Sequence, residues 1–285
     1  MFVNGRHNMT YLSAIFLGII QGVAEFLPIS SSGHLSIFQN FFGLTNVEGE
    51  HLFFDVLLHF GTLIAVFIFY RQEIMDLILE CIAVLKREKS PMGKEAGIDN
   101  RRLILMIIFG TLPLFIVLPI KDRVEGLYNN TIFIGCALLL TGLMLFFSDR
   151  VAHGKKTARQ ATVFDALLVG VAQSVATVPG ISRSGSTICT GLCCGFSRSF
   201  AVKFSFFLSI PAILGANILS LVDAISGGID WSMFPKYVVG VLAATIAGYF
   251  SLRFLKRLAE KKGLGAFSYY CWGAGLVTLI LSLIK

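Results

Sequence analysis

Long apolar runs constrain this chain more than any other feature of its sequence. Hydrophobic residues make up 55% of the 285 residues, and charged residues make up 14%. A run of about 17 to 25 apolar residues can cross a bilayer as a helix, which pairs its own backbone polar groups. We therefore expect an all-α polytopic membrane protein, with spans near 52–70, 103–120, 131–148, 203–222, 235–252 and 266–284.

The Lys and Arg residues divide unevenly between the two sides that these spans define. Sixteen lie in segments 71–102, 149–162 and 253–264, whereas five lie on the opposite side. The positive-inside rule makes the first side cytoplasmic and places both termini outside. The net charge of +7 is thus explained by membrane orientation. Because we expect no soluble basic domain, we do not expect a nucleic acid partner.

A polar segment, QGVAEFLPISSSGHL at 21–35, interrupts the apolar pattern and is echoed later in the chain. At an offset of 152 residues, GIIQGVAEFLPISSSG (18–33) aligns with GVAQSVATVPGISRSG (170–185). A weaker echo aligns LHFGTLIAV (58–66) with LSIPAILGA (208–216) at an offset of 150. Internal similarity of this kind predicts a duplicated architecture.

Each polar segment is interrupted by Pro, Gly and Ser, which suits a re-entrant hairpin of two half-helices better than one continuous span. The apolar run near 10–20 lacks a small-residue cleavage pattern, so we expect it to form part of the first hairpin and not a signal peptide. Three crossings per repeat would invert the second repeat, and the two hairpins would then meet inside the bilayer. The predicted organisation is a first repeat at 1–148 (hairpin about 10–42, three spans), a cytoplasmic linker at 149–161, and a second repeat at 162–285 (hairpin about 163–200, three spans).

Two charged residues fall inside these segments, at membrane depth. An acid or an Arg at the bilayer centre costs about 2.5 to 3.5 kcal/mol, so Glu25 and Arg183 are candidates for function. Gln21 lies four residues before Glu25, on the same helical face, and the pair could offer oxygen ligands to Mg²⁺ or Ca²⁺. The alternative is a Gln–Glu hydrogen bond that only supports helix packing.

Serine-rich turns follow the proline in both segments. Pro28 should end the first half-helix, and Pro179 and Gly180 the corresponding one, with the next half-helix beginning near Thr187. Two helix N-termini aimed at one point would form an anion site suited to phosphate, and Arg183 adds a forked donor. Serine caps also occur at membrane breaks that bind no ligand. The caps in question are Ser30, Ser31 and Ser32, and Ser182 to Ser186.

Other polar residues are weaker candidates. His34 follows Ser31 by three residues and could serve as a general base or acid for a serine nucleophile or a water, or it could be a packing residue. Asp55 and His59 form a second i, i+4 pair, for which packing is the favoured interpretation. Asn217 and Gln173 are weaker again.

The two motifs together resemble a known family. QGVAEFLPISSSGHL resembles the (E/Q)xxxE segment and serine-rich turn of the bacterial undecaprenyl-diphosphate phosphatase family (bacitracin-resistance protein, BacA/UppP type), and PGISRSGST (179–187) resembles its PGxSRSxxT segment. DVLLHFGTLIAV (55–66) and FSFFLSIPAILGA (204–216) extend the similarity over nearly the whole chain. The resemblance implies a phosphatase of the cytoplasmic (inner) membrane that converts undecaprenyl diphosphate to undecaprenyl phosphate. It also implies a role in peptidoglycan synthesis and bacitracin resistance, with the active site open to the outer face.

The resemblance also implies roles for individual residues. Gln21 and Glu25 match the pair linked to a divalent cation, Mg²⁺ or Ca²⁺; Gln21 departs from the Glu of some members, so Glu25 would carry more of the metal binding. Ser31 matches the proposed nucleophile, His34 the associated histidine and Arg183 the pyrophosphate-binding arginine. The further phosphate-binding candidates are Ser30, Ser32, Ser182, Ser184 and Thr187.

The expected reaction is in-line attack on the terminal phosphorus by Ser31, with His34 managing the proton and the cation bridging phosphate oxygens. Direct attack by water is the alternative. A lipid-phosphate transporter or flippase is the competing class, since inverted repeats with broken helices are typical of carriers. The expected partners are the lipid substrate and membrane lipid, and the sequence leaves a homodimer open.

Overall fold

The computed structural model describes residues 9–41, 50–151, 154–226, 231–261 and 263–284. Within these ranges the protein is all-helical, apart from one isolated backbone bridge between Lys156 and Phe196. The predicted fold class, an all-α polytopic membrane protein, is confirmed. The α-helices are α1 (Tyr11–Phe26), α2 (Ser31–Phe41), α3 (Glu50–Phe69), α4 (Arg71–Leu85), α5 (Lys94–Thr111), α6 (Lys121–Gly126), α7 (Thr131–Ser148), α8 (Val163–Val175), α9 (Arg183–Cys193), α10 (Arg198–Ser226), α11 (Phe234–Lys261) and α12 (Ala266–Ile284).

The described part of the chain has five helical segments long and apolar enough to cross a membrane, or six when a bent pair is included. The bent pair is α3 with α4, which meet at an angle of 84°. The run expected at 103–120 is not one uninterrupted α-helix. Regular α-helix ends at Thr111, and two 3₁₀ turns follow, η1 (Leu112–Ile116) and η2 (Leu118–Ile120), each with a proline in its first residues. Proline lacks the backbone N–H that continued α-helix would require, which accounts for the change.

The two polar segments fold as hairpins with matching caps. Thr10 caps α1 in a capping box with Ser13, and Thr162 caps α8 in a capping box with Asp165. The return helices α2 and α9 have eleven residues each and begin at corresponding positions. Since all of these pairs are separated by 152 residues, the repeat in the sequence corresponds to a repeat in local structure.

Each hairpin packs on a helix from the other half of the chain. Gly18 of α1 lies so close to α11 that an added Cβ would stand 2.4 Å from the Gly240 carbonyl oxygen. Its counterpart in α8, Gly170, lies equally close to α5, with 2.3 Å to the Gly110 carbonyl oxygen. Small residues allow membrane helices to approach backbone to backbone. The two halves are therefore interlocked by their hairpins.

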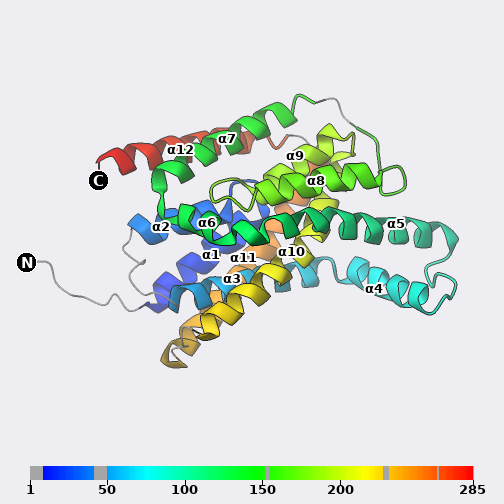
Figure 1. Cartoon of the computed structure of the whole chain (residues 1–285), viewed down its shortest axis with the longest axis horizontal. Helices are drawn as coiled ribbons and strands as arrows, with labels where there is room; N and C mark the ends of the chain where they lie inside the picture. The colour runs from blue at the N-terminus through cyan, green and yellow to red at the C-terminus, as the bar shows by residue number, and fades with distance from the viewer. Residues whose placement is uncertain (1–8, 42–49, 152–153, 227–230, 262, 285) are drawn as a thin grey trace, which may run out of the picture.

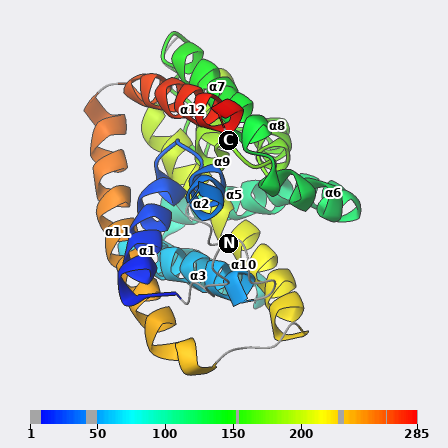
Figure 2. The same cartoon turned by 90° about the vertical axis from the view of Figure 1, so that its left-hand side faces the viewer.

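The remaining helices also pair between the halves. Helix α7 lies along α12, where Gly135 faces Gly275, and α3 packs against α10. Figure 2 shows α2 near the centre of the molecule, with α1 and α11 on one side, α7 and α12 above, and α3 and α10 below. The first hairpin is thus enclosed by helices from both repeats.

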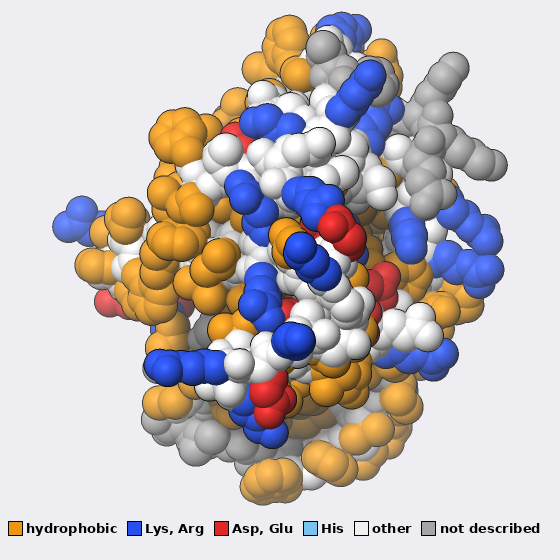
Figure 3. Space-filling model, turned by 90° about the vertical axis from the view of Figure 1, so that its right-hand side faces the viewer, with side chains coloured by type: hydrophobic (Ala, Val, Ile, Leu, Met, Phe, Trp, Pro, Cys, Tyr) orange, Lys and Arg blue, Asp and Glu red, His pale blue; other side chains and the backbone are white. Residues whose placement is uncertain are grey.

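The hairpins approach each other with their turns in the middle of the molecule (Figure 1). The Ser184 hydroxyl donates a hydrogen bond of 3.1 Å to the Leu27 carbonyl, which joins the two turns directly. Figure 3 shows Lys and Arg side chains gathered over the end of the molecule that carries the α4–α5 connection. The opposite end carries α6 and the C-terminus in Figure 1.

A matched pair of glycine substitutions tests the interlock. Gly18→Ala should destabilise the protein in detergent by about 1 to 3 kcal/mol, because the new methyl group would overlap the backbone of α11. Gly273 of α12 has no atom within 4 Å of an added Cβ, so Gly273→Ala should be neutral or stabilising through its better helix propensity. Thermal unfolding measures both variants. Equal stability of the two would contradict the close approach of α1 and α11.

Candidate active site

In each hairpin, residues of the turn cap the N-terminus of the helix that follows. Ser30 adopts a left-handed backbone conformation with φ of 71°, and its hydroxyl accepts a hydrogen bond of 3.2 Å from the Gly33 N–H. In the second turn Gly180 takes the positive φ, and the Ser182 hydroxyl accepts a bond of 3.1 Å from the Gly185 N–H. The predicted helix start near Thr187 is therefore wrong. Helix α9 begins at Arg183, because Ser182 is the residue that caps it.

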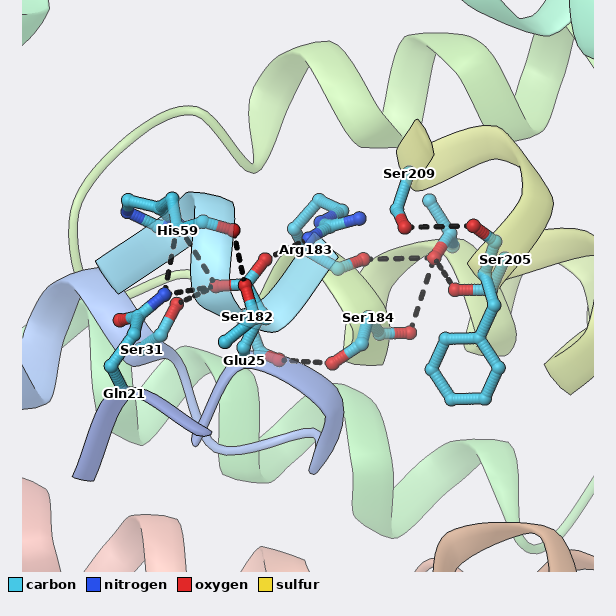
Figure 4. Close-up of polar contacts among 12 residues, drawn as sticks. Gln21, Glu25, Ser31, His59, Ser182, Arg183, Ser184, Ser205 and Ser209 are labelled. Carbon is cyan, nitrogen blue, oxygen red and sulfur yellow. Dashed lines mark hydrogen bonds and ion pairs between the residues drawn. The ribbon is translucent and has the colours of Figure 1, made fainter. Parts of the chain in front are cut away.

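Glu25 is the centre of a polar cluster that both hairpins share. One of its carboxylate oxygens pairs with the Arg183 guanidinium from the second hairpin. The other oxygen accepts hydrogen bonds from the Ser31 hydroxyl at 2.7 Å and from Gln21 Nε2 at 2.9 Å. Nδ1 of His59 in α3 lies 3.4 Å from the same oxygen (Figure 4). The sequence-predicted residues Gln21, Glu25, Ser31 and Arg183 are thus brought together.

The surroundings of Glu25 explain how a carboxylate is tolerated in the middle of a membrane protein. Glu25 is buried, and an isolated buried charge is costly unless it is paired and hydrogen-bonded. Arg183 supplies the opposite charge, and Ser31 and Gln21 supply donors. Because Arg183 belongs to the other repeat, Glu25 acquires its counter-charge only when the two hairpins are assembled.

His34 lies elsewhere. Its Nδ1 is 2.7 Å from the Ser30 carbonyl oxygen and its Nε2 is 2.8 Å from the Tyr270 hydroxyl of α12. Both ring nitrogens are therefore engaged away from Ser31, whose hydroxyl bonds to Glu25. The expected pairing of His34 with Ser31 does not form in this structure. A catalytic role for His34 stays a prediction.

His59 is the histidine that reaches the cluster, and the sequence interpretation underrated it. Its Nδ1 contacts Gln21 Nε2 at 2.8 Å. Its partner in the i, i+4 pair, Asp55, accepts two hydrogen bonds of 3.1 Å from Gln39. A polar pair inside an apolar span was the available signal, since such groups in membranes tend to mark functional sites.

A cavity of about 670 Å³ opens beside the cluster. The two hairpin turns form its polar wall, and α10 with the η1–α6 segment forms a largely apolar wall. This size and mixed lining are typical of small-molecule sites. Of the predicted phosphate-binding residues, Ser30, Ser32, Ser182, Arg183 and Ser184 line the cavity. Thr187 is not among the lining residues, and its hydroxyl bonds to the Arg183 and Ser184 carbonyls and to the Ser205 hydroxyl.

The oxygen atoms near Glu25 fit a hard divalent cation. Gln21 Oε1 is buried and has no hydrogen-bond partner among the described residues, although a buried carbonyl oxygen normally has one. It belongs to the same cluster as the Glu25 carboxylate. No group of three or more His, Cys, Asp or Glu suited to a metal occurs in the described part of the chain. Mg²⁺ commonly takes one or two protein oxygens and completes its shell with water and phosphate.

These features define a class of protein: a multi-pass helical membrane protein with two facing hairpins that hold a charged site beside a cavity with one polar and one largely apolar wall. The family model for bacitracin resistance protein BacA matches residues 14–277. The chain belongs to this family, as the motifs indicated.

Curated relatives align over nearly their whole length. The chain is 41% identical over 277 residues to the undecaprenyl-diphosphatase of Alkaliphilus metalliredigens, covering 97% of this chain and 100% of that protein. It is 41% identical over 279 residues to the undecaprenyl-diphosphatase of Carboxydothermus hydrogenoformans, covering 96% and 98%. The undecaprenyl-diphosphatase of Methanosphaera stadtmanae is 38% identical over 284 residues, with coverage of 96% and 98%.

A double-substitution cycle tests the central ion pair. Arg183→Met should lower stability in detergent by about 3 kcal/mol while leaving the protein folded, because Glu25 would stay buried without its counter-charge. Adding Glu25→Gln should restore most of that loss. The exposed pair Arg159–Glu95 is the control, and Arg159→Met should change stability by less than about 1 kcal/mol. A double variant no more stable than Arg183→Met would contradict the coupling of the two charges.

Proposed function

We propose that this protein is an undecaprenyl-diphosphate phosphatase whose reaction takes place between the two hairpin turns. The observation that carries the proposal is the contact between Ser31 and Glu25, opposite Arg183. A hydroxyl bonded to a carboxylate is the arrangement of a nucleophile with its base, and a guanidinium is suited to phosphate oxygens. The names of the relatives, undecaprenyl-diphosphatase, agree with this chemistry.

The diphosphate headgroup would bind against the hairpin turns, and the prenyl chain would follow the apolar wall of the cavity. Arg183 and the N-termini of α2 and α9 supply positive charge and N–H donors for the phosphate oxygens. Ser30, Ser32, Ser182 and Ser184 lie on the same wall of the cavity. The Thr187 hydroxyl would support Arg183 by donating to the Arg183 backbone carbonyl, and it would not contact the phosphate.

Arg183 can pair either with the Glu25 carboxylate or with the substrate phosphate, and the exchange between these partners would control when the reaction starts. Without substrate its guanidinium pairs with the Glu25 carboxylate. When a diphosphate enters, the guanidinium can turn toward phosphate oxygens and leave Glu25 free to take the Ser31 proton. Substrate binding would therefore activate the nucleophile.

The first chemical step is an in-line displacement. The Ser31 Oγ forms a bond to the terminal phosphorus while the bond from that phosphorus to the bridging oxygen breaks, which releases undecaprenyl phosphate. The Ser31 proton passes to Glu25, 2.7 Å away. Glu25 then gives this proton to the departing undecaprenyl phosphate and is again a carboxylate. A water next attacks the phosphorus of the phosphoserine and gives a proton to Glu25, while the bond from that phosphorus to Ser31 Oγ breaks. Glu25 returns this proton to Oγ, and inorganic phosphate leaves.

Glu25 and Gln21 would hold the divalent cation, Mg²⁺ or Ca²⁺. When bound, this ion would neutralise part of the diphosphate charge. His59 contacts both residues and would hold their side chains in place.

We place the protein in the bacterial cytoplasmic membrane, with the cavity open to the outer face. The basic segments of the sequence gather at the end remote from the cavity lining formed by α6 and η3 (Leu127–Asn129). The positive-inside rule makes that basic end cytoplasmic. The two repeats would then be inverted relative to each other, each hairpin entering from its own face.

Replacement of Ser31 tests the nucleophile. Ser31→Ala should reduce phosphate release from a prenyl diphosphate in the presence of Mg²⁺ by at least about a hundredfold, because water alone would have to attack. Mass spectrometry of acid-quenched wild-type protein should find phosphoserine at Ser31. Ser251→Ala serves as the control, since Ser251 bonds within its own helix at the Ala247 carbonyl. A Ser31→Ala protein that retains most of its turnover would exclude covalent catalysis and leave direct attack by water.

Replacement of Arg183 tests the phosphate site. Arg183→Ala should abolish phosphate release, because no other cation is provided by either hairpin turn within the cavity lining. Size-exclusion chromatography in detergent should show that the variant remains folded, and Arg159→Ala is the matched control at an exposed ion pair. Near-normal phosphate release by Arg183→Ala would overturn the assignment of the site.

A further inference from the structure

Gln173 is a buried amide on the cavity wall that the reaction described above does not use. It lies in α8, lines the cavity, and is only 1% exposed. Neither its Oε1 nor its Nε2 has a hydrogen-bond partner among the described residues. A buried amide without a partner costs about 1 to 3 kcal/mol, and most buried side-chain polar groups do have one. Gln173 therefore lies in the cavity wall with both polar atoms of its amide buried and without a partner among the described residues.

In its counterpart in the first hairpin, Gln21, the amide nitrogen is engaged. Gln21, 152 residues earlier, donates from Nε2 to Glu25 and contacts His59. In the second repeat, the position of Glu25 is Thr177, whose hydroxyl donates to the Ser174 carbonyl at 2.8 Å. The position of His59 is Ser209, whose hydroxyl donates to the Phe206 carbonyl at 2.7 Å. The first hairpin side thus has a carboxylate and a histidine, whereas on the second side hydroxyl residues stand at both positions and the amide has no partner among the described residues.

The neighbours of Gln173 show which part of the substrate it would meet. One helical turn earlier, Gly170 packs against Gly110 and Pro113, at the start of η1. The next residue of η1, Leu114, already belongs to the apolar wall of the cavity. Gln173 therefore lies where the polar wall gives way to the apolar wall. In a prenyl diphosphate, this boundary corresponds to the phosphate attached to the lipid.

We propose that Gln173 binds the lipid-linked phosphate, the group that the substrate and the product share. This inference rests on the proposed phosphatase function and assigns the second phosphate of the same site. The Nε2 hydrogens donate to oxygens of that phosphate. Arg183 binds the terminal phosphate, which Ser31 attacks. A neutral donor binds an anion less tightly than a charged one, which favours release of the lipid monophosphate after the reaction.

Kinetics of an isosteric variant test the assignment. Gln173→Met should raise the KM for a prenyl diphosphate about tenfold and raise the inhibition constant of the corresponding prenyl monophosphate by the same factor. The inhibition constant of inorganic phosphate should stay unchanged, because that anion carries no lipid-linked phosphate, and kcat should change by no more than about twofold. Gln173→Glu should weaken both lipid ligands further, since a carboxylate repels phosphate.

Stability measurements separate binding from a structural role. Removing an unpartnered amide should leave the melting temperature of Gln173→Met in detergent equal to or above that of the wild type. Ser186→Ala is the matched control. Its buried hydroxyl also lacks a partner in the described part of the chain, but it is not among the residues lining the cavity, so KM should not change.

Several outcomes would overturn the proposal. The first is an unchanged KM for the prenyl diphosphate together with an unchanged inhibition constant for the prenyl monophosphate. The others are a decrease confined to kcat, an equal rise in the inhibition constant of inorganic phosphate, or a clear loss of stability. Equilibrium binding of the prenyl monophosphate to the same variants needs no turnover. A wild type that binds this ligand, with Gln173→Met binding it about tenfold more weakly, would support the role of Gln173 even if phosphate release were absent. Absent phosphate release would refute only the proposed function.

Discussion

The pairing of Glu25 with Arg183 is the interaction on which the rest of the structure depends. Each charge would be costly at the centre of a membrane protein, and each comes from a different hairpin. The pair therefore requires the two hairpin turns to meet, and the Ser184 bond to the Leu27 carbonyl secures the same junction. A site that needs both turns can form only in the assembled fold. The charged pair is therefore present only when both hairpins are in place.

Small residues make that meeting geometrically feasible. Gly18 and Gly170 allow each hairpin to rest on the backbone of a helix from the opposite repeat. Neither α1 nor α8 is long enough to be a conventional span, so the position of each in the molecule depends on these contacts and on its cap. The duplicated halves are then free to differ in chemistry. The first carries Ser31 and Glu25, and the second carries Arg183 and the uncharged Gln173.

Much of the fold and part of the site followed from local pattern. The apolar runs predicted the spans, and the proline- and serine-rich motifs predicted two hairpins and four of the residues that cluster, namely Gln21, Glu25, Ser31 and Arg183. The start of α9 was misplaced because several serines compete to cap a helix, and only backbone geometry selects Ser182. The choice between His34 and His59 was beyond pattern as well. His34 is closer to Ser31 in sequence, but its ring turns toward Tyr270.

The sequence by itself determined the membrane class, the repeated hairpin motif and the chemical types present at each turn, because hydrophobicity, motif spacing and residue identity can be read from the sequence alone. Only the tertiary structure decided which groups touch. Contacts such as His59 with Gln21, 38 residues apart, and Arg183 with Glu25, 158 residues apart, depend on how helices pack and not on spacing along the chain. The same packing left Gln173 unpartnered on the cavity wall, although its sequence context closely repeats that of Gln21.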